Sequence, residues 1–103
     1  MSKVWVLHPV DRDISMASDY GTVQYIAERG VNIFNVEQFT DGLVGILGGG
    51  FKKDDMFLMV GNLVGNALTL HVLLQLFGNV NVLIFHARSQ KYVKMVIEGK
   101  KMP

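Results

Sequence analysis

Residues that could take part in chemistry, most of them polar, follow the apolar segments of this chain at the points where those segments end. They are His8, Asp11 and Asp13 after residues 4–7, Gly61, Asn62 and Asn66 after residues 56–60, and His86 and Arg88 after residues 81–85. If the apolar segments are parallel strands of an open α/β sheet, their carboxyl ends share one edge, and ligands bind at that edge. We therefore treat these residues as candidate ligand-binding residues.

The chemistry indicated is the binding of a nucleotide or other small anion. Gly61-Asn62 precedes a predicted helix, whose free N–H groups and dipole favour negative charge, and Asn66 one turn further on could add a donor. The chain has neither G-x-G-x-x-G after its first strand nor G-x-x-x-x-G-K-[ST] anywhere. These absences favour the alternative that Gly61 and Asn62 are ordinary turn and N-cap residues.

Other site chemistries fit the sequence less well. Imidazole and carboxylate groups suit zinc or manganese, and the chain could supply them from His8, Asp11, Asp13 and His86. These residues form no dense ligand motif, so we expect no metal. The chain has no cysteine, which excludes disulfides, Cys-ligated zinc and thiol catalysis. No serine follows a nucleophile-elbow pattern. We assign no catalytic residue, expect no cofactor, and favour a protein that is not an enzyme.

The element that must position the central candidates is a βαβ unit over residues 55–85. It has an apolar strand at 56–60, a helix from about 63 to 77 that Gly78 ends, and a second apolar strand at 81–85. Both strands are continuous hydrophobic runs, which is typical of parallel strands covered on both faces. The helix is apolar on almost every side, so we expect one flank to meet the sheet and the other a second helix or a second subunit.

The remaining elements complete an α/β fold. Before the central unit we predict an interior strand at 4–7, a short helix at 14–20, an edge strand at 22–26 broken by Arg29-Gly30, and an amphipathic helix from 35 that the glycine triplet 48–50 terminates. After it, a five-residue loop can only join 81–85 to an antiparallel strand at 91–97.

The order predicts a three-layer Rossmann-like sandwich, with a mostly parallel sheet and a C-terminal antiparallel hairpin strand. Residues 1–98 form a single domain, and residues 99–103 a basic C-terminal tail.

Composition points to a covered surface. Half of the 103 residues are hydrophobic and 18% are charged, against roughly a quarter in ordinary domains. We therefore expect a homo-oligomer or a protein-binding surface. A net charge of +1 provides no global field for nucleic acid. The apolar stretches are shorter than the roughly 20 residues that a membrane span needs, and no signal-peptide core is found, so we expect no membrane association and a cytoplasmic protein.

Short motifs at strand ends and turns run along nearly the whole chain: Asp13-Ile-Ser15 with Ala17 and Tyr20-Gly21, Val31-Asn-Ile-Phe-Asn35, Gly61, Val80-Asn-Val-Leu-Ile-Phe85 and Lys91-Tyr-Val93. With these motifs the chain resembles a group of small uncharacterised proteins encoded by tailed bacteriophages. The resemblance implies a phage accessory protein made in the cytoplasm of the host bacterium. It carries over no catalytic residue.

Three hypotheses of function follow. The first is an oligomeric interaction protein that binds a host or phage protein, which the apolar composition and the missing catalytic constellation favour. The alternative is a binder or hydrolase of a nucleotide or other small anion at the strand ends. A third, nucleic-acid binding, depends only on Tyr92 between Lys91 and Lys94 in the last hairpin, and the low net charge argues against it.

Overall fold

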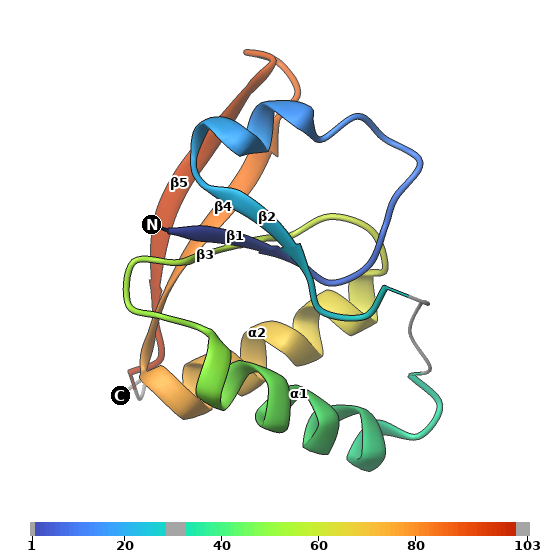
Figure 1. The fold of residues 1–103 in the computed structure, drawn as a ribbon. Helices are drawn as coiled ribbons and strands as arrows, with labels where there is room; N and C mark the ends of the chain where they lie inside the picture. The colour runs from blue at the N-terminus through green and yellow to red at the C-terminus, as the bar shows by residue number, and fades with distance from the viewer. Residues whose placement is uncertain (1, 29–32, 101–103) are drawn as a thin grey trace.

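The computed structural model describes residues 2–28 and 33–100, which form a five-stranded mixed sheet with two long helices (Figure 1). The elements are β1 (Lys3–Val6), the 3-10 helix η1 (Ser15–Asp19), β2 (Thr22–Tyr25), α1 (Val36–Gly50), β3 (Met56–Leu58), α2 (Leu63–Phe77), β4 (Asn79–His86) and β5 (Lys91–Glu98).

The strand order is β2-β1-β3-β4-β5; β1 to β4 are parallel, and β5 is antiparallel to β4. The mostly parallel sheet and its antiparallel last strand are thus confirmed. Part of the sequence-based interpretation cannot be compared, because Arg29-Gly30, residues 31–32 and residues 101–103 of the tail lie outside the described residues.

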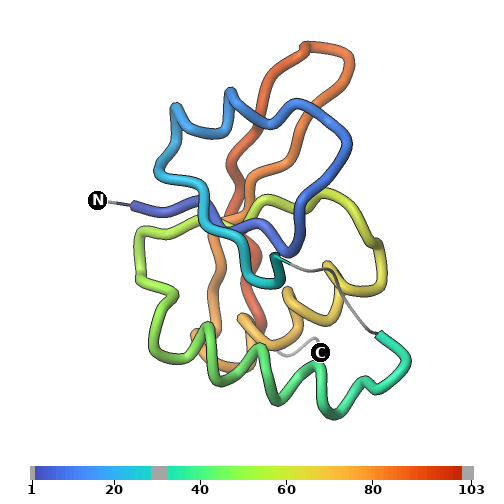
Figure 2. The backbone as a smooth tube through the Cα atoms, turned by 45° about the vertical axis from the view of Figure 1, so that its right-hand side comes forward, coloured from blue at the N-terminus to red at the C-terminus, as the bar shows by residue number. Residues whose placement is uncertain are grey.

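The two faces of the sheet are covered unequally. Figures 1 and 2 show α1 and α2 together on one face, whereas residues 10–20 cross the other. The helix-side core contains Trp5, Leu7, Leu43, Leu47, Phe57, Leu73 and Val82, and the opposite core contains Val4, Val6, Ala17, Leu58, Leu83 and Tyr92. A three-layer Rossmann-like sandwich is therefore not confirmed. On the second face the short 3-10 helix η1 stands in place of a long helix, and Ala17 is the residue of η1 that is buried in the core there.

α2 packs against β4 and α1, so the predicted second flank meets a helix of the same chain. It is nevertheless less buried than its composition suggested. Its buried residues include the polar Asn66 and Thr69, while the side chains of Leu63, Val64, Leu76 and Phe77 are exposed to varying degrees. Thr69 can face inward because its hydroxyl donates to the Gly65 carbonyl of its own helix at 2.8 Å. Neither long helix, nor any other in the described part of the chain, has the length and hydropathy to cross a membrane.

α1 ends at the glycine triplet, as expected from sequence, but all three glycines are still helical. The helix continues through Gly50 and ends where the Phe51 N–H donates to the Leu47 carbonyl at 3.0 Å. A Cβ on Gly50 would lie 3.1 Å from the Trp5 ring, so this glycine lets the helix end approach the core. Gly45 and Gly48 have no such neighbour.

We predict that Gly45→Ala and Gly48→Ala each stabilise the protein by about 1 kcal/mol, because alanine costs less backbone entropy in a helix and meets open space. Gly50→Ala should gain less or lose stability, since the Trp5 ring must shift. Urea unfolding of the three variants measures this. Equal stabilisation by all three would contradict the role given to Gly50.

Asp55 is a buried carboxylate that ties β1 to β3. Its side chain accepts hydrogen bonds from the Lys3 N–H at 2.8 Å, the Trp5 indole at 2.9 Å and the Lys52 N–H at 2.9 Å, and only 2% of the residue is exposed. Burial by itself raises the pKa of Asp55, but the bonds from Trp5, Lys3 and Lys52 outweigh it, so the pKa lies below its usual value. The ionised form is therefore the one that stabilises the fold.

We predict that Asp55→Ala lowers the free energy of unfolding at pH 7 by about 3 kcal/mol, because it leaves buried donors without an acceptor. A carboxyl with a depressed folded pKa stabilises above its unfolded pKa of about 4, and this contribution is lost as the pH falls through the folded pKa. The wild-type advantage over Asp55→Ala should therefore shrink below about pH 4. The exposed Asp54→Ala is the matched control, and a loss as large as that of Asp55→Ala would contradict this account.

Candidate functional site

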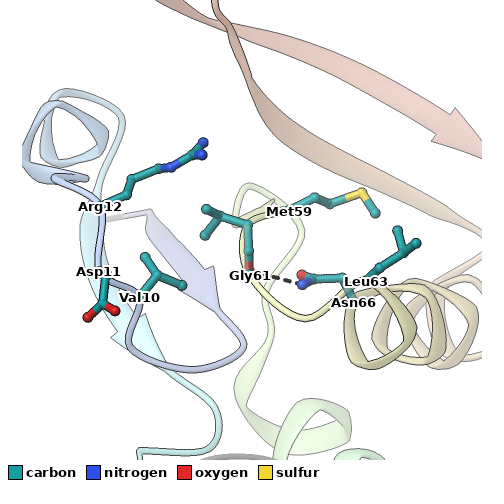
Figure 3. A pocket seen from close by; sticks show the side chains of 8 residues that line it. Val10, Asp11, Arg12, Met59, Gly61, Leu63 and Asn66 are labelled. Atoms are coloured by element: carbon teal, nitrogen blue, oxygen red, sulfur yellow. Dashed lines mark hydrogen bonds between the residues drawn. The ribbon is translucent and has the colours of Figure 1, made fainter.

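A cleft opens where the chain leaves β1 and β3. These strands are neighbours. After β1 the chain continues to β2 on one side of the pair, whereas after β3 it continues to β4 on the other side. The segments after the two strands therefore diverge, as at the ligand-binding edge of open α/β sheets. The cleft has a volume of about 560 Å³ and is lined by Val10, Asp11, Arg12, Met59, Val60, Gly61, Leu63 and Asn66 (Figure 3).

His8 joins the segments that follow β1 and β3. Its Nδ1 lies 2.8 Å from the Pro9 carbonyl oxygen, and its Nε2 lies 3.0 Å from the backbone nitrogen of Asn62. Because the carbonyl only accepts and the amide only donates, the contacts define the neutral tautomer with the proton on Nδ1. His8 is thus placed as a structural bridge and is not among the residues that line the cleft.

Gly61 makes that bridge possible. Its φ of +95° lies in the region that favours glycine, and a Cβ at this position would lie 2.6 Å from His8 Nε2. The turn therefore needs glycine for its backbone conformation and for its contact with the imidazole ring.

The N-terminus of α2 borders the cleft. Asn62 is the N-cap, and its Oδ1 accepts a hydrogen bond from the Gly65 N–H at 2.7 Å, as the N-cap interpretation predicted. The first N–H groups of a helix have no partner within it. After the cap takes Gly65, the N–H groups of Leu63 and Val64 are those the helix itself leaves available.

Asn66 is the unusual residue of the site. Its Nδ2 donates to the carbonyls of Val60 at 2.9 Å and Asn62 at 2.7 Å, which fixes the orientation of the amide. Its Oδ1 is buried and accepts no hydrogen bond from the residues that the structure describes, although Asn66 as a whole is only 3% exposed. A buried acceptor without a donor costs about 1–3 kcal/mol. Figure 3 shows this amide on the cleft side of α2, directed at the turn before it.

The charged residues of the cleft favour an anion. Figure 3 shows Arg12 extending from its loop toward the side of the cleft formed by Met59, whereas the carboxylate of neighbouring Asp11 points away from Met59 and Asn66. The guanidinium and the α2 N-terminus therefore contribute positive potential to the same space. Arg12 was not among the residues singled out from sequence; its position in the loop after the first strand was the available signal.

The other candidates lie elsewhere. Asp13 Oδ1 accepts from the Ser15 N–H at 2.9 Å, and this bond lowers the pKa of the Asp13 carboxyl. β3 pairs with β4 only as far as Leu83, and β4 runs on with β5 as a two-stranded ribbon. His86 and Arg88 are therefore at its tip, where His86 Nδ1 contacts the Ser89 hydroxyl at 2.8 Å. Within residues 2–28 and 33–100, no three His, Asp or Glu side chains gather closely enough to hold a metal.

We predict that Gly61→Ala destabilises the protein by about 3 kcal/mol, since it combines backbone strain with a clash against His8. Gly78→Ala is the matched control: Gly78 also has a positive φ, of +80°, but no atom within 4 Å of a Cβ. It should cost only about 1 kcal/mol. Adding His8→Ala to Gly61→Ala should recover part of the loss, as a double-mutant cycle by urea unfolding would measure. Additive effects would exclude the clash.

Comparison with known proteins gives one match. The model of the family described as Phage Pam3 gp32-like protein matches residues 5–99. No curated protein and no solved structure matches the chain. The matched region includes all the elements from η1 to β5 and the whole of the cleft. The chain therefore belongs to the Phage Pam3 gp32-like protein family, and it is a small phage protein as the motifs at its strand ends indicated.

Proposed function

We propose that this phage protein binds a small organic anion in the cleft between the ends of β1 and β3. The observation that carries the proposal is the unpartnered Oδ1 of Asn66, a buried acceptor in the wall of a cleft that also receives Arg12 and the N-terminus of α2. This oxygen is closed to water in the free protein, so the N–H or O–H group of a ligand reaches it only when the Asn66 amide turns toward the cleft, and the contact then removes its desolvation cost.

The lining defines the class of ligand. Arg12 and the free N–H groups at the start of α2 suit a phosphate or carboxylate, to which a guanidinium can donate two parallel hydrogen bonds. Val10, Met59 and Leu63 supply apolar walls for a carbon skeleton or a base. A phosphate ester with a neighbouring hydroxyl, such as a nucleotide, meets all three demands, and the cleft volume is within the usual range for such ligands.

The lining supports binding rather than hydrolysis. It contains no histidine, serine or lysine that could act as a base or nucleophile, and Asp11 is turned away from the space occupied by Arg12. The structural role given to His8 removes the nearest imidazole from consideration, because both of its nitrogens already have backbone partners. We therefore propose a carrier or sensor of the anion.

The cytoplasm of the host bacterium is the compartment we propose, because nucleotides and other phosphate esters are abundant there. Binding of a host or phage protein stays a prediction. It is compatible with the ligand site, since an accessory protein can present different surfaces to a ligand and a partner.

We predict that nucleoside monophosphates raise the melting temperature of the wild-type protein and that inorganic phosphate does so less, because it lacks the apolar part. Arg12→Ala should weaken binding by about tenfold through loss of charge-assisted hydrogen bonds. Arg88→Ala removes the same charge at the tip of the hairpin and should leave affinity unchanged. Isothermal titration calorimetry with adenosine monophosphate, and then with a panel of carboxylates, measures both.

Equal weakening by Arg12→Ala and Arg88→Ala would show a general charge effect instead of a site. A melting temperature unchanged by any phosphate ester or carboxylate at millimolar concentration would exclude the proposed function.

A further inference from the structure

β5 is an edge strand whose outer hydrogen-bonding groups can be identified. It is last in the strand order, and within the described residues it pairs only with β4. The Gly99 N–H donates to the Gly78 carbonyl at 2.7 Å, which makes this pair a hydrogen-bonded position of the ladder. Because such positions alternate along an antiparallel strand, the backbone groups of Lys94, Val96 and Glu98 point away from β4. These groups form an open edge (Figure 1).

The edge also carries exposed apolar side chains. Val96 is 57% exposed and Met95 42% exposed, and Val93 is exposed to a similar degree. A long, regular edge with such residues is a template for another strand unless charges oppose pairing. Lys94, near the middle of β5, is the charge that decides which strand can pair.

A second copy of the same strand fits when the two are antiparallel and centred on Val96. Outward-pointing residues must face one another, so this register places Lys94 opposite Glu98 of the second copy, and symmetry repeats the pair on the other side. Shifting the centre to Lys94 would bring two lysines face to face. Centring on Met95 would place Lys94 opposite Val96. Among these registers, only the one centred on Val96 brings opposite charges directly across from each other.

The same register covers apolar surface on both faces of the joined sheet. Val96 lies beside Val96 of the second copy on the face opposite the helices. On the helix side, exposed Met95 lies across from Ile97 of the second copy, whose own side chain packs against the helix-side core. Hydrogen bonds, apolar contacts and charges therefore favour one arrangement.

We propose that the protein forms a symmetric dimer in which the β5 strands of two copies pair antiparallel, centred on Val96, to give one continuous sheet. The interface is at β5, which β4 separates from the strands that border the cleft, and it contains none of the residues that line the cleft. Its test is consequently independent of the ligand.

Analytical ultracentrifugation of the full chain at micromolar concentration should give twice the chain mass of 11.5 kDa. Val96→Pro should give a monomer that is still folded. The Val96 N–H is not bonded to β4, so proline removes no bond within the chain but removes the central bonds of the dimer.

Charge variants test the register without depending on proline. Lys94→Glu and Glu98→Lys each place like charges opposite one another and should raise the dissociation constant about tenfold, since two pairs change sign. Mixing the two variants should restore tight pairing, because every facing pair then has opposite charges. Lys91→Glu, which changes the same charge outside the facing residues, is the control and should leave the constant unchanged.

A wild-type protein that is still a monomer at about 100 micromolar would overturn the proposal, because the dissociation constant would then be weaker than that concentration. So would a dimer that Val96→Pro leaves intact while circular dichroism shows the variant folded, or a mixture of the two charge variants that associates no better than either one separately.

Discussion

The pairing of β1 with β3 is the constraint on which the rest of the structure depends. Only Val4, Trp5 and Val6 of β1 face residues of β3, so the ladder is short. It is fastened at both ends by side chains that bond backbone N–H groups. Asp55 holds the amino end through Lys3 and Lys52, and His8 holds the carboxyl end through Asn62. The Lys3–Asp55 bond spans 52 residues of sequence and the Asn62–His8 bond spans 54, so both connect the two strands over long distances in the chain.

The fastening at the carboxyl end also shapes the cleft. Because His8 bonds the backbone of the N-cap residue of α2, the helix terminus is held beside the loop that carries Arg12. Gly61 allows this contact because glycine can adopt the positive φ of the turn. Asn66 secures the turn by donating hydrogen bonds to the carbonyls of Val60 and Asn62. The residue that secures the turn is the one left with a buried acceptor. In the proposed function, local structure and ligand binding would therefore depend on one side chain.

The sequence predicted what depends on runs of similar residues and missed what depends on distant partners. Hydrophobic runs predicted the parallel strands. Asn62 and Gly78 are the N-cap and C-cap of α2, so the helix begins and ends where expected. Lys52-Lys53-Asp54-Asp55 has the composition of an exposed loop, but Asp55 is buried and bonded to Lys3 and Trp5, which are far away in sequence. Gly61 was a candidate because it follows the third strand, and Asn66 because it lies one turn into the helix that begins there; both line the cleft. His86 and Arg88 were grouped with them because they follow the fourth strand. Their distance from the cleft depends on how far the β4–β5 ribbon extends past β3, which local sequence pattern does not reveal.

The apolar excess of the composition is explained only partly by the core. α2 was expected to be shielded on all sides, yet its inward stripe includes Asn66 and Thr69, whose donors bond carbonyls of the helix and of the turn before it. These two polar side chains occupy interior positions of α2, whereas apolar side chains of the same helix, such as Leu63, are exposed. β5 also carries exposed apolar side chains, and there they lie beside a row of regularly spaced backbone N–H and C=O groups. Exposed apolar groups on a helix can meet many shapes, whereas the hydrogen-bonding groups of an open strand edge restrict the register of any strand that pairs with it. The proposed dimer is therefore argued from the edge of β5 and not from the helix surface.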